Sequence, residues 1–220
     1  MPPTNPVATV GGGYLGGMEF QEVVRRRRMV RRYDVERAVP AEVVEQILDN
    51  ALRAPSAGFA QGFGFLVLDN QDDIARFRAA ATPDEGPDKW LAAKVQTPLL
   101  IVVHSNKDAY LDRYAEPDKG HTDRAEDWWP VPYWDVDAGM SALLILQSAV
   151  DAGLGACFFG LPADRIPVYR EQFGVPDNFM PTGAVSIGYS DEPARDLSKR
   201  RKPPTDLIHR GRWSSADGQA

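Results

Sequence analysis

The residues best suited to chemistry in this chain are arginines, six of which fall within eight positions of the 220-residue sequence. A run of like charges is commonly a solvated surface, and that interpretation stays open here. Charged segments on a solvated surface usually contain both positive and negative residues, or lysine. A run of arginine alone differs, and a guanidinium group makes paired hydrogen bonds to phosphate. The run therefore favours a phosphate site, and a second basic patch lies at 196–202. The six residues are Arg25, Arg26, Arg27, Arg28, Arg31 and Arg32.

Two further stretches can present backbone groups to a ligand. Residues 156–159 form a short apolar run that stops at Gly160, and a glycine leaves neighbouring amides uncovered by a side chain. Residues 56–62 form a polar, glycine-containing loop directly after Ala54 and Pro55. Together with the two basic patches, these stretches suit a planar cofactor that carries a phosphate.

Other chemistries find little support in the sequence. Cys157 lies within an apolar run, where burial disfavours the thiolate form of a nucleophile. The three histidines have no metal-ligand spacing, and we assign neither a metal site nor a catalytic acid or base. Residues 11–16 match the dinucleotide pattern GxGxxG, but the arginines at 27–32 stand where a Rossmann unit needs a second buried strand.

Composition narrows the functional classes further. The net charge of −6 and the pI near 5.1 disfavour nucleic acid as a general partner. The single cysteine excludes an internal disulfide, and no signal peptide is visible, so we expect a cytoplasmic protein. The apolar run at 138–150 is bounded by Asp137 and Asp151 and is shorter than the roughly 20 residues of a membrane span. No membrane association is expected.

That run defines the central element. Almost every position from 138 to 150 is apolar or small, which predicts a helix covered on all sides. Its small residues let another helix approach closely, either from the same chain or from a second subunit. We expect one domain at 18–213, a flexible tail at 1–17 and a disordered C-terminus at 214–220. Predicted helices cover 20–28, 40–53, 71–81 and 162–173, and predicted strands cover 63–68, 99–104, 156–159 and 182–189.

The segment 105–132 is polar and has no clear periodicity, yet it contains several aromatic residues. Long irregular segments with aromatics commonly form lids or pocket walls. Packing of the aromatics on the outside of the core is an equally good interpretation for any one of them.

In four separate places the chain resembles the FMN-dependent nitroreductase family. The first is Arg27-Arg28-Met29-Val30-Arg31-Arg32-Tyr33, and the second is Ala54-Pro55-Ser56 with Gln61 and Phe63. The third runs from Asp137-Ala-Gly139 through Gly153-Leu-Gly155 to Phe159-Gly160, and the fourth is Lys199-Arg200-Arg201-Lys202-Pro203. Their common order and spacing make the resemblance specific. It implies a nitroreductase-like α+β fold with three layers, in which helices flank a mostly antiparallel sheet, and an intertwined homodimer with FMN at the subunit interface.

The resemblance also implies a set of cofactor-binding residues. Arg27, Arg28, Lys199 and Arg201 would lie near the FMN phosphate, Arg31 near the pyrimidine edge of the ring, and Met29 beside them. Pro55 and Ser56 would reach the flavin of the partner subunit, and the Phe159 and Gly160 amides would face N5 and O4 of the ring. Gln61 and Phe158 would also contact the cofactor, with Phe158 at the wall of the substrate pocket. Phe59, Trp128 and Trp129 would wall the substrate pocket.

The implied activity is hydride transfer from NAD(P)H through flavin N5 to a nitroaromatic, a quinone or a similar small aromatic acceptor, with ping-pong kinetics. The chain departs from the family where Phe59 replaces an asparagine and Gly62-Phe63 replaces Pro-Trp. This loop is similar to that of the flavin-fragmenting enzymes that make the dimethylbenzimidazole lower ligand of cobalamin, which form the second hypothesis. A non-catalytic flavin or deazaflavin binder, or a desaturase on the same scaffold, also stays open, and a nucleic-acid module built on the arginine run is the third hypothesis.

Overall fold

The computed structural model describes residues 17–83, 96–196 and 198–213. The expectations for the tail at 1–16 and for the C-terminus at 214–220 fall outside these residues.

A four-stranded sheet forms the middle of the domain. It consists of β1 (Phe63–Leu68), β2 (Leu99–Ser105), β3 (Gly155–Phe159) and β4 (Met180–Gly188), in the order β1-β2-β4-β3, with all three neighbouring pairs antiparallel. Every residue of β2 is buried, as its run of Leu, Ile and Val predicts for a central strand covered on both faces. The predicted strands are all present.

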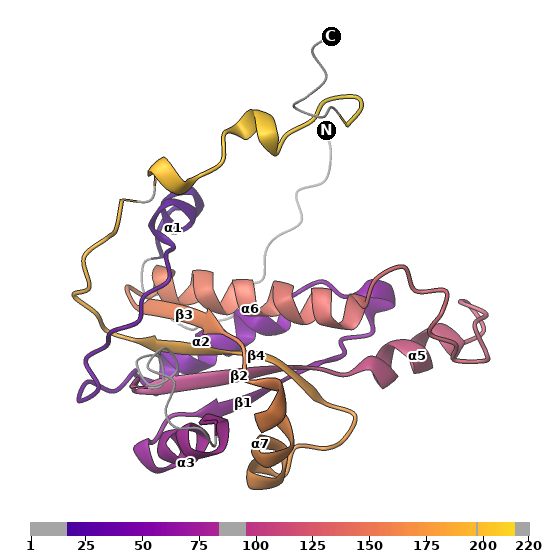
Figure 1. The fold of residues 1–220 in the computed structure, drawn as a ribbon, viewed down its shortest axis with the longest axis horizontal. Coiled ribbons are helices and arrows are strands. Elements are labelled where there is room, and N and C mark those ends of the chain that lie inside the picture. The colour runs from indigo at the N-terminus through magenta and orange to yellow at the C-terminus, as the bar shows by residue number, and fades with distance from the viewer. Residues whose placement is uncertain (1–16, 84–95, 197, 214–220) are drawn as a thin grey trace, which may run out of the picture.

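Helices cover both faces of the sheet. Leu99, Ile101 and Val103 pack with α2 (Ala41–Leu52) and α6 (Tyr133–Asp151), whereas Leu100 and Val102 face α3 (Gln71–Ala81) and α7 (Ile166–Phe173). This division follows from the two-residue alternation of side chains along a strand. Figure 1 shows the resulting three layers, with α2 and α6 on one side of the sheet and α3 and α7 on the other. The predicted three-layer α+β fold is confirmed.

The prediction that the central helix is covered on all sides is wrong for the single chain. Ala138, Ile145 and Ala149 of α6 are fully buried, but Met140 and Leu143 are 40% and 46% exposed. The sheet and α2 reach one side of α6 only, so an apolar face remains open. Within the described residues, no helix is long and apolar enough to cross a membrane.

The ends of α6 carry different neighbours. At its C-terminal end lies α1 (Phe20–Arg26), while α5 (Lys107–Ala115) lies at the N-terminal end (Figure 1). The expectation of an irregular segment at 105–132 is therefore wrong over α5, whose first turn is capped by the Asn106 side chain. The remaining short turns are the 3₁₀ helices η1 (Ala57–Phe59), η2 (Ala163–Arg165), η3 (Ser198–Arg200) and η4 (Pro204–Asp206).

Candidate functional site

The arginines of the first motif line one open cavity with the basic residues from the end of the chain. We call this volume of about 940 Å³ the arginine cavity. Four of the predicted phosphate and ring ligands, Arg27, Arg28, Arg31 and Arg201, line it together with Met29. Lys199 lies between two lining residues in η3 but is not itself part of the wall. The other lining residues are Arg25, Arg26, Glu192, Ala194, Arg195, Asp196, Ser198 and Arg200.

The first motif is fixed to the edge of the sheet. Met29 forms a parallel bridge with Ala156 of β3, and the Val30 amide donates to the Ala156 carbonyl at 2.9 Å. The Tyr33 hydroxyl contacts the Val30 carbonyl at 2.5 Å and the Ser186 carbonyl at 3.1 Å. Burial raises the pKa of Tyr33 far above its usual value, so the hydroxyl remains a donor at neutral pH. The arginines therefore extend from a rigid backbone.

Glu192 holds the same segment from the other side. Its buried carboxylate accepts the amides of Arg31 at 2.9 Å and Arg32 at 3.1 Å, and the Arg28 guanidinium donates to the Glu192 carbonyl. Burial alone would raise the pKa of Glu192, but the two amides and the charges of Arg28 and Arg195 outweigh burial and lower it. Glu192 therefore stays ionised and ties the first motif to the chain that follows β4.

The arginines of the cavity differ in their partners. Arg25 and Arg26 contact Glu22 at 3.6 and 2.5 Å. Arg28 lies 4.0 Å from the Glu192 carboxylate. Among the described residues, no carboxylate oxygen lies within 4.0 Å of the other cavity arginines, which can bind an anion without breaking an ion pair. These are Arg27, Arg31, Arg195, Arg200 and Arg201.

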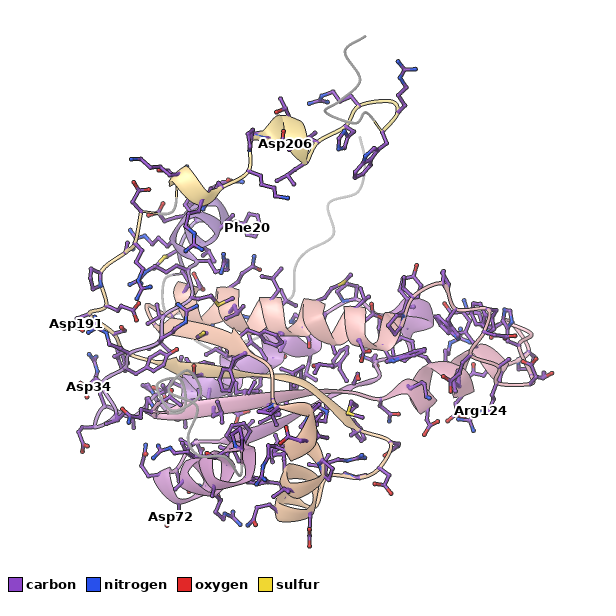
Figure 2. The ribbon with its side chains drawn as sticks, viewed as in Figure 1. Phe20, Asp34, Asp72, Arg124, Asp191 and Asp206 are labelled. Atoms are coloured by element: carbon purple, nitrogen blue, oxygen red, sulfur yellow. The ribbon has the colours of Figure 1, made fainter. Side chains whose placement is uncertain are left out.

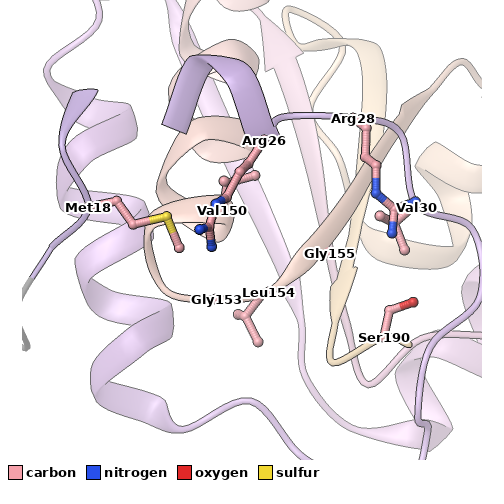
Figure 3. A pocket seen from close by; sticks show the side chains of 9 residues that line it. All are labelled: Met18, Arg26, Arg28, Val30, Val150, Gly153, Leu154, Gly155 and Ser190. Carbon is pink, nitrogen blue, oxygen red and sulfur yellow. The ribbon is translucent and has the colours of Figure 1, made fainter. Parts of the chain in front are cut away.

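A smaller pocket of about 150 Å³ lies behind this wall, between α1 and the start of β3. Figure 3 shows the side chains of Arg26 and Arg28 reaching into it, with Gly153, Leu154 and Gly155 along its floor and Ser190 opposite. A side chain at Gly155 would collide with Val30, because a Cβ there would lie 2.7 Å from Val30 Cγ1. The glycine thus lets the first motif approach β3 closely.

The predicted ring-edge residues lie at the end of β3. Phe159 is buried in the core on the α3 and α7 side, while Phe158 is half-buried on the α6 side against Gly183. A Cβ at Gly183 would lie 2.3 Å from Phe158 Cζ, so the bare backbone of β4 makes room for this ring. Nothing lies within 4 Å of the position of a Cβ at Gly160, and the backbone there is accessible, as the sequence predicted.

The second motif forms a tightly held loop at the opposite end of α6. The Asp137 carboxylate accepts the Ala57 amide and the Tyr110 hydroxyl, both at 2.8 Å, and the Arg113 guanidinium donates to the Gly58 carbonyl at 2.9 Å. The Ser56 hydroxyl accepts the Gln61 amide at 2.9 Å. Burial and the hydrogen bond to Asp137 raise the pKa of Tyr110, which keeps this donor protonated.

This loop presents Phe59 to solvent in a strained conformation. Phe59 is 76% exposed at φ 57°, and Gln61 has φ 49°, values that non-glycine residues rarely adopt. Such strain persists only where the surroundings enforce it and is commonly found at functional sites. Pro55 is exposed and Ser56 half-buried on the same loop.

The two predicted tryptophans belong to an aromatic cluster beside the loop. Trp128 stacks on His121 at 4.0 Å between ring centroids, and Trp129 packs on Tyr114 at 4.7 Å. Tyr114 in turn fills the space beside Gly58, where a Cβ would lie 2.7 Å from its ring. The structure therefore brings Trp128 and Trp129 together with the Phe59 loop, and the cluster also supports that loop from behind.

The predicted site residues thus form two separate groups in the single chain. The arginine cavity lies at the C-terminal end of α6, and the Phe59 loop with the tryptophans lies at its N-terminal end. A helix of 19 residues is about 28 Å long. Figure 2 shows the same separation, with Phe20 of α1 and Arg124 of the aromatic segment far apart.

Three supporting residues were missed at the sequence level: Glu192, Asp137 and Tyr110. The contacts of Asp137 join residues 80 and 27 positions apart, which no local pattern encodes. Glu192 gave a weak signal as an acidic residue next to a basic patch. No group of three His, Cys, Asp or Glu side chains suited to a metal occurs in the part of the chain that the structure describes.

The cavity and its surroundings can hold a phosphorylated ring. The arginines supply charge-assisted donors, and the exposed end of β3 supplies backbone groups with no side chain in front of them. A cofactor with one phosphate and a flat polar ring, such as FMN, fits these residues.

Comparisons with known proteins identify the family of the chain. A model of the nitroreductase family matches residues 24–189. A protein of Methanothermobacter thermautotrophicus provisionally named NADH dehydrogenase/NAD(P)H nitroreductase is 27% identical over 204 residues, which cover 91% of each chain. A Staphylococcus aureus protein named NADPH-dependent oxidoreductase is 20% identical and matches 87% of this chain and 72% of its own.

A solved structure shows the same fold. The nitroreductase-type protein of Exiguobacterium sibiricum, solved in complex with FMN, is 24% identical, with a TM-score of 0.67 over 90% of this chain and 98% of the other.

Proposed function

The chain belongs to the nitroreductase family, and from its site we propose that it is an FMN-dependent oxidoreductase that uses NAD(P)H to reduce a small aromatic acceptor such as a nitroaromatic or a quinone. The observation that carries the proposal is the arginine cavity beside the open end of β3. Either nicotinamide form is proposed as the donor because the names of the relatives include both NADH and NADPH.

The residues of this chain would bind and orient the cofactor. Within the described residues Arg27 and Arg201 form no ion pair, and they would hold the phosphate with Arg28 and Lys199. Arg31 would lie near the pyrimidine edge, where a cation stabilises negative charge on the reduced ring. The Phe159 and Gly160 backbone would contact the polar ring edge. Bound FMN supplies a ring nitrogen that accepts hydride from a nicotinamide and returns it to an acceptor in the same place.

The energies allow tight, noncovalent binding. Three charge-assisted hydrogen bonds of about 1.5–3 kcal/mol each total about 5–9 kcal/mol. A micromolar complex requires about 8 kcal/mol, before the costs of association and the gain from ring contacts. The protein therefore needs no covalent link to the flavin.

We further propose that the working unit is a homodimer. Pro55, Ser56 and Gln61 would then reach the flavin of the other subunit, and Phe59, Trp128 and Trp129 would wall its substrate pocket. The separation of the two groups along α6 supports this, because one chain alone leaves each group incomplete. The exposed Met140 and Leu143 lie on the face of α6 that a second subunit would cover.

Two experiments test the proposal. The first is a visible spectrum of the purified protein, followed by anaerobic addition of NADPH or NADH. Flavin bands that bleach within seconds are expected, and a colourless protein that does not take up FMN would refute the proposal. The second is an initial-rate study, in which parallel double-reciprocal plots are expected for ping-pong kinetics and intersecting plots would exclude that mechanism.

A third experiment tests the dimer. Within the described chain, nothing lies within 4 Å of a Cβ at Gly139 on α6. We therefore expect Gly139→Leu to leave the fold intact while weakening the dimer, as measured by sedimentation. A variant that dimerises as strongly as the unmodified protein would show that this part of α6 is not in the interface.

A further inference from the structure

The arginine cavity contains more positive charge than one FMN requires. Its described wall includes eight arginines, and only three carboxylates, those of Glu22, Glu192 and Asp196, belong to the wall or to its ion pairs. Five positive charges are therefore unmatched. A phosphate monoester carries nearly two negative charges at neutral pH, and a reduced flavin ring carries one more. Two cations of the cavity remain after FMN is bound.

The arginines left over by this assignment are Arg195 and Arg200. Neither is among the residues assigned to FMN, although Arg200 stands in the fourth motif, and both line the same cavity. Arg195 contributes to lowering the pKa of Glu192, yet its guanidinium lies more than 4.0 Å from any carboxylate oxygen of the described residues. Arg200 likewise has no carboxylate within that distance among the residues described.

The backbone that carries these two arginines is held in place. Glu192 is fixed by the amides of Arg31 and Arg32, and its own amide donates to the Ser190 hydroxyl at 3.1 Å. Farther along, the Asp196 carboxylate accepts the Ser198 amide at 2.9 Å. Arg195 and Arg200 thus follow backbone that is hydrogen-bonded at Glu192 and at Ser198, beside the FMN phosphate residues.

We infer that Arg195 and Arg200 form a second phosphate subsite, which binds the 2′-phosphate of NADPH and makes NADPH the preferred electron donor. The inference rests on the proposed function, because it identifies the donor of that same site. NADPH differs from NADH only by this phosphate. Its nearly two negative charges would be balanced by the two unmatched cations. Arginine suits such a group because its guanidinium can donate two parallel hydrogen bonds to phosphate oxygens.

The first test is a binding measurement that needs no turnover. Adenosine 2′,5′-bisphosphate and adenosine 5′-monophosphate are titrated into the purified protein, as isolated and after addition of FMN, with calorimetric detection. We expect the bisphosphate to bind about 30-fold or more tightly than the monophosphate at low salt, in line with two charge-assisted contacts. Equal affinities would refute the subsite, whether or not the protein holds flavin.

The second test uses the double variant R195Q/R200Q, with R76Q/R124Q as its matched control. Arg76 pairs with Asp73 and Arg124 with Asp108, both of them half-buried acids away from the cavity wall, so the control changes the net charge equally. We expect R195Q/R200Q to lose about tenfold or more in kcat/KM for NADPH, with kcat/KM for NADH and the FMN content unchanged. The control should retain the NADPH preference of the unmodified protein.

The other outcomes contradict the inference in distinguishable ways. Loss of FMN from R195Q/R200Q would assign these arginines to the flavin phosphate. Equal losses with both donors would indicate general electrostatic attraction without a subsite. An unmodified protein that holds FMN and oxidises NADH and NADPH equally well would refute the donor preference while leaving the proposed function intact. A protein that contains no flavin and does not take up added FMN would refute the proposed function itself.

Discussion

Replacing Asp137 should most clearly distinguish the role of the Phe59 loop from that of the arginine cavity. Its carboxylate is 4% exposed and accepts hydrogen bonds from the Ala57 amide and the Tyr110 hydroxyl, each at 2.8 Å. Asp137→Ala leaves both donors without this acceptor in a buried place. The change is therefore expected to loosen the Phe59 loop without touching the arginine cavity.

The magnitude follows from the two hydrogen bonds. A hydrogen bond to a charged group contributes about 1.5–3 kcal/mol, so losing two should lower the free energy of unfolding by about 3–6 kcal/mol. Asp137→Asn keeps one carbonyl oxygen as an acceptor and should cost about half as much. Tyr110→Phe removes one donor only and should also cost about 1.5–3 kcal/mol.

The assay is urea denaturation followed by far-UV circular dichroism at a fixed protein concentration, since the stability of the proposed dimer would depend on concentration. The matched control is Asp135→Ala on the same helix, where the exposed carboxylate accepts only the Ser105 hydroxyl at 2.6 Å. We expect about 1.5 kcal/mol for the control, the low end of the range for one hydrogen bond to a charged group, because the Asp135 carboxylate is exposed. The functional readout is KM for the acceptor, which should rise in Asp137→Asn, whereas FMN affinity should fall less because the arginine cavity that would hold the phosphate is unchanged.

One result would refute this reasoning directly. If Asp137→Ala costs less than about 1 kcal/mol, or no more than Asp135→Ala, the network around Asp137 does not hold the loop. A normal stability loss with unchanged acceptor KM would leave the network intact but remove the Phe59 loop from the substrate site.

Three further predictions concern stability. Burial raises the pKa values of Tyr33, Tyr110 and Tyr169 above the ordinary value of 10.0, so unfolding releases protons above about pH 10. The free energy of unfolding should therefore fall there by up to about 4 kcal/mol per pH unit, which urea titrations from pH 9 to 11 can measure. Tyr169→Phe should reduce this slope by about a third. Gly183→Ala should lower the free energy of unfolding by about 1–3 kcal/mol, because the new Cβ would collide with Phe158. Gly160→Ala, whose Cβ would have no described atom within 4 Å, should lower it by less than about 1 kcal/mol in the same denaturation assay. The pKa of Glu192 is lowered, so its contribution to the free energy of unfolding is present above pH 4.5 and is lost as pH falls. Glu192→Gln should remove that part of the decrease in stability at acid pH. An unchanged decrease would show that the carboxylate is not held as described.

The sequence predicted the layers well because their signals are local. The apolar runs of β1 and β2 and the helical periodicity of α2 and α3 depend on neighbouring residues, and all four elements appear within a residue or two of their expected ends. Their order in the sheet is set by pairing between distant strands and could not be read from periodicity. Helix α5 was missed because its residues are mixed in polarity and only the Asn106 cap marks its start.

The arginine side of the site could also be predicted from sequence, for a different reason. Six arginines in eight positions are an unusual local pattern, and the second basic patch repeats the same residue type. The sequence could not predict which of these arginines contact acidic residues of the protein itself. Arg25 and Arg26 turn to Glu22, and Arg28 turns to the chain at Glu192, because of contacts that depend on the folded positions of those acids.

The remaining part of the site follows from the geometry of α6. A helix with an apolar surface on every side predicts complete burial, yet one face of α6 stays open in the single chain, between the arginine cavity at one end and the strained Phe59 loop at the other. In a second copy related by a two-fold axis perpendicular to α6 at this face, α6 would run in the opposite direction. The Phe59 loop of each chain would then lie beside the arginine cavity of its partner. The same contact would bury the exposed Met140 and Leu143, so one arrangement accounts both for the open apolar face and for the division of the site residues.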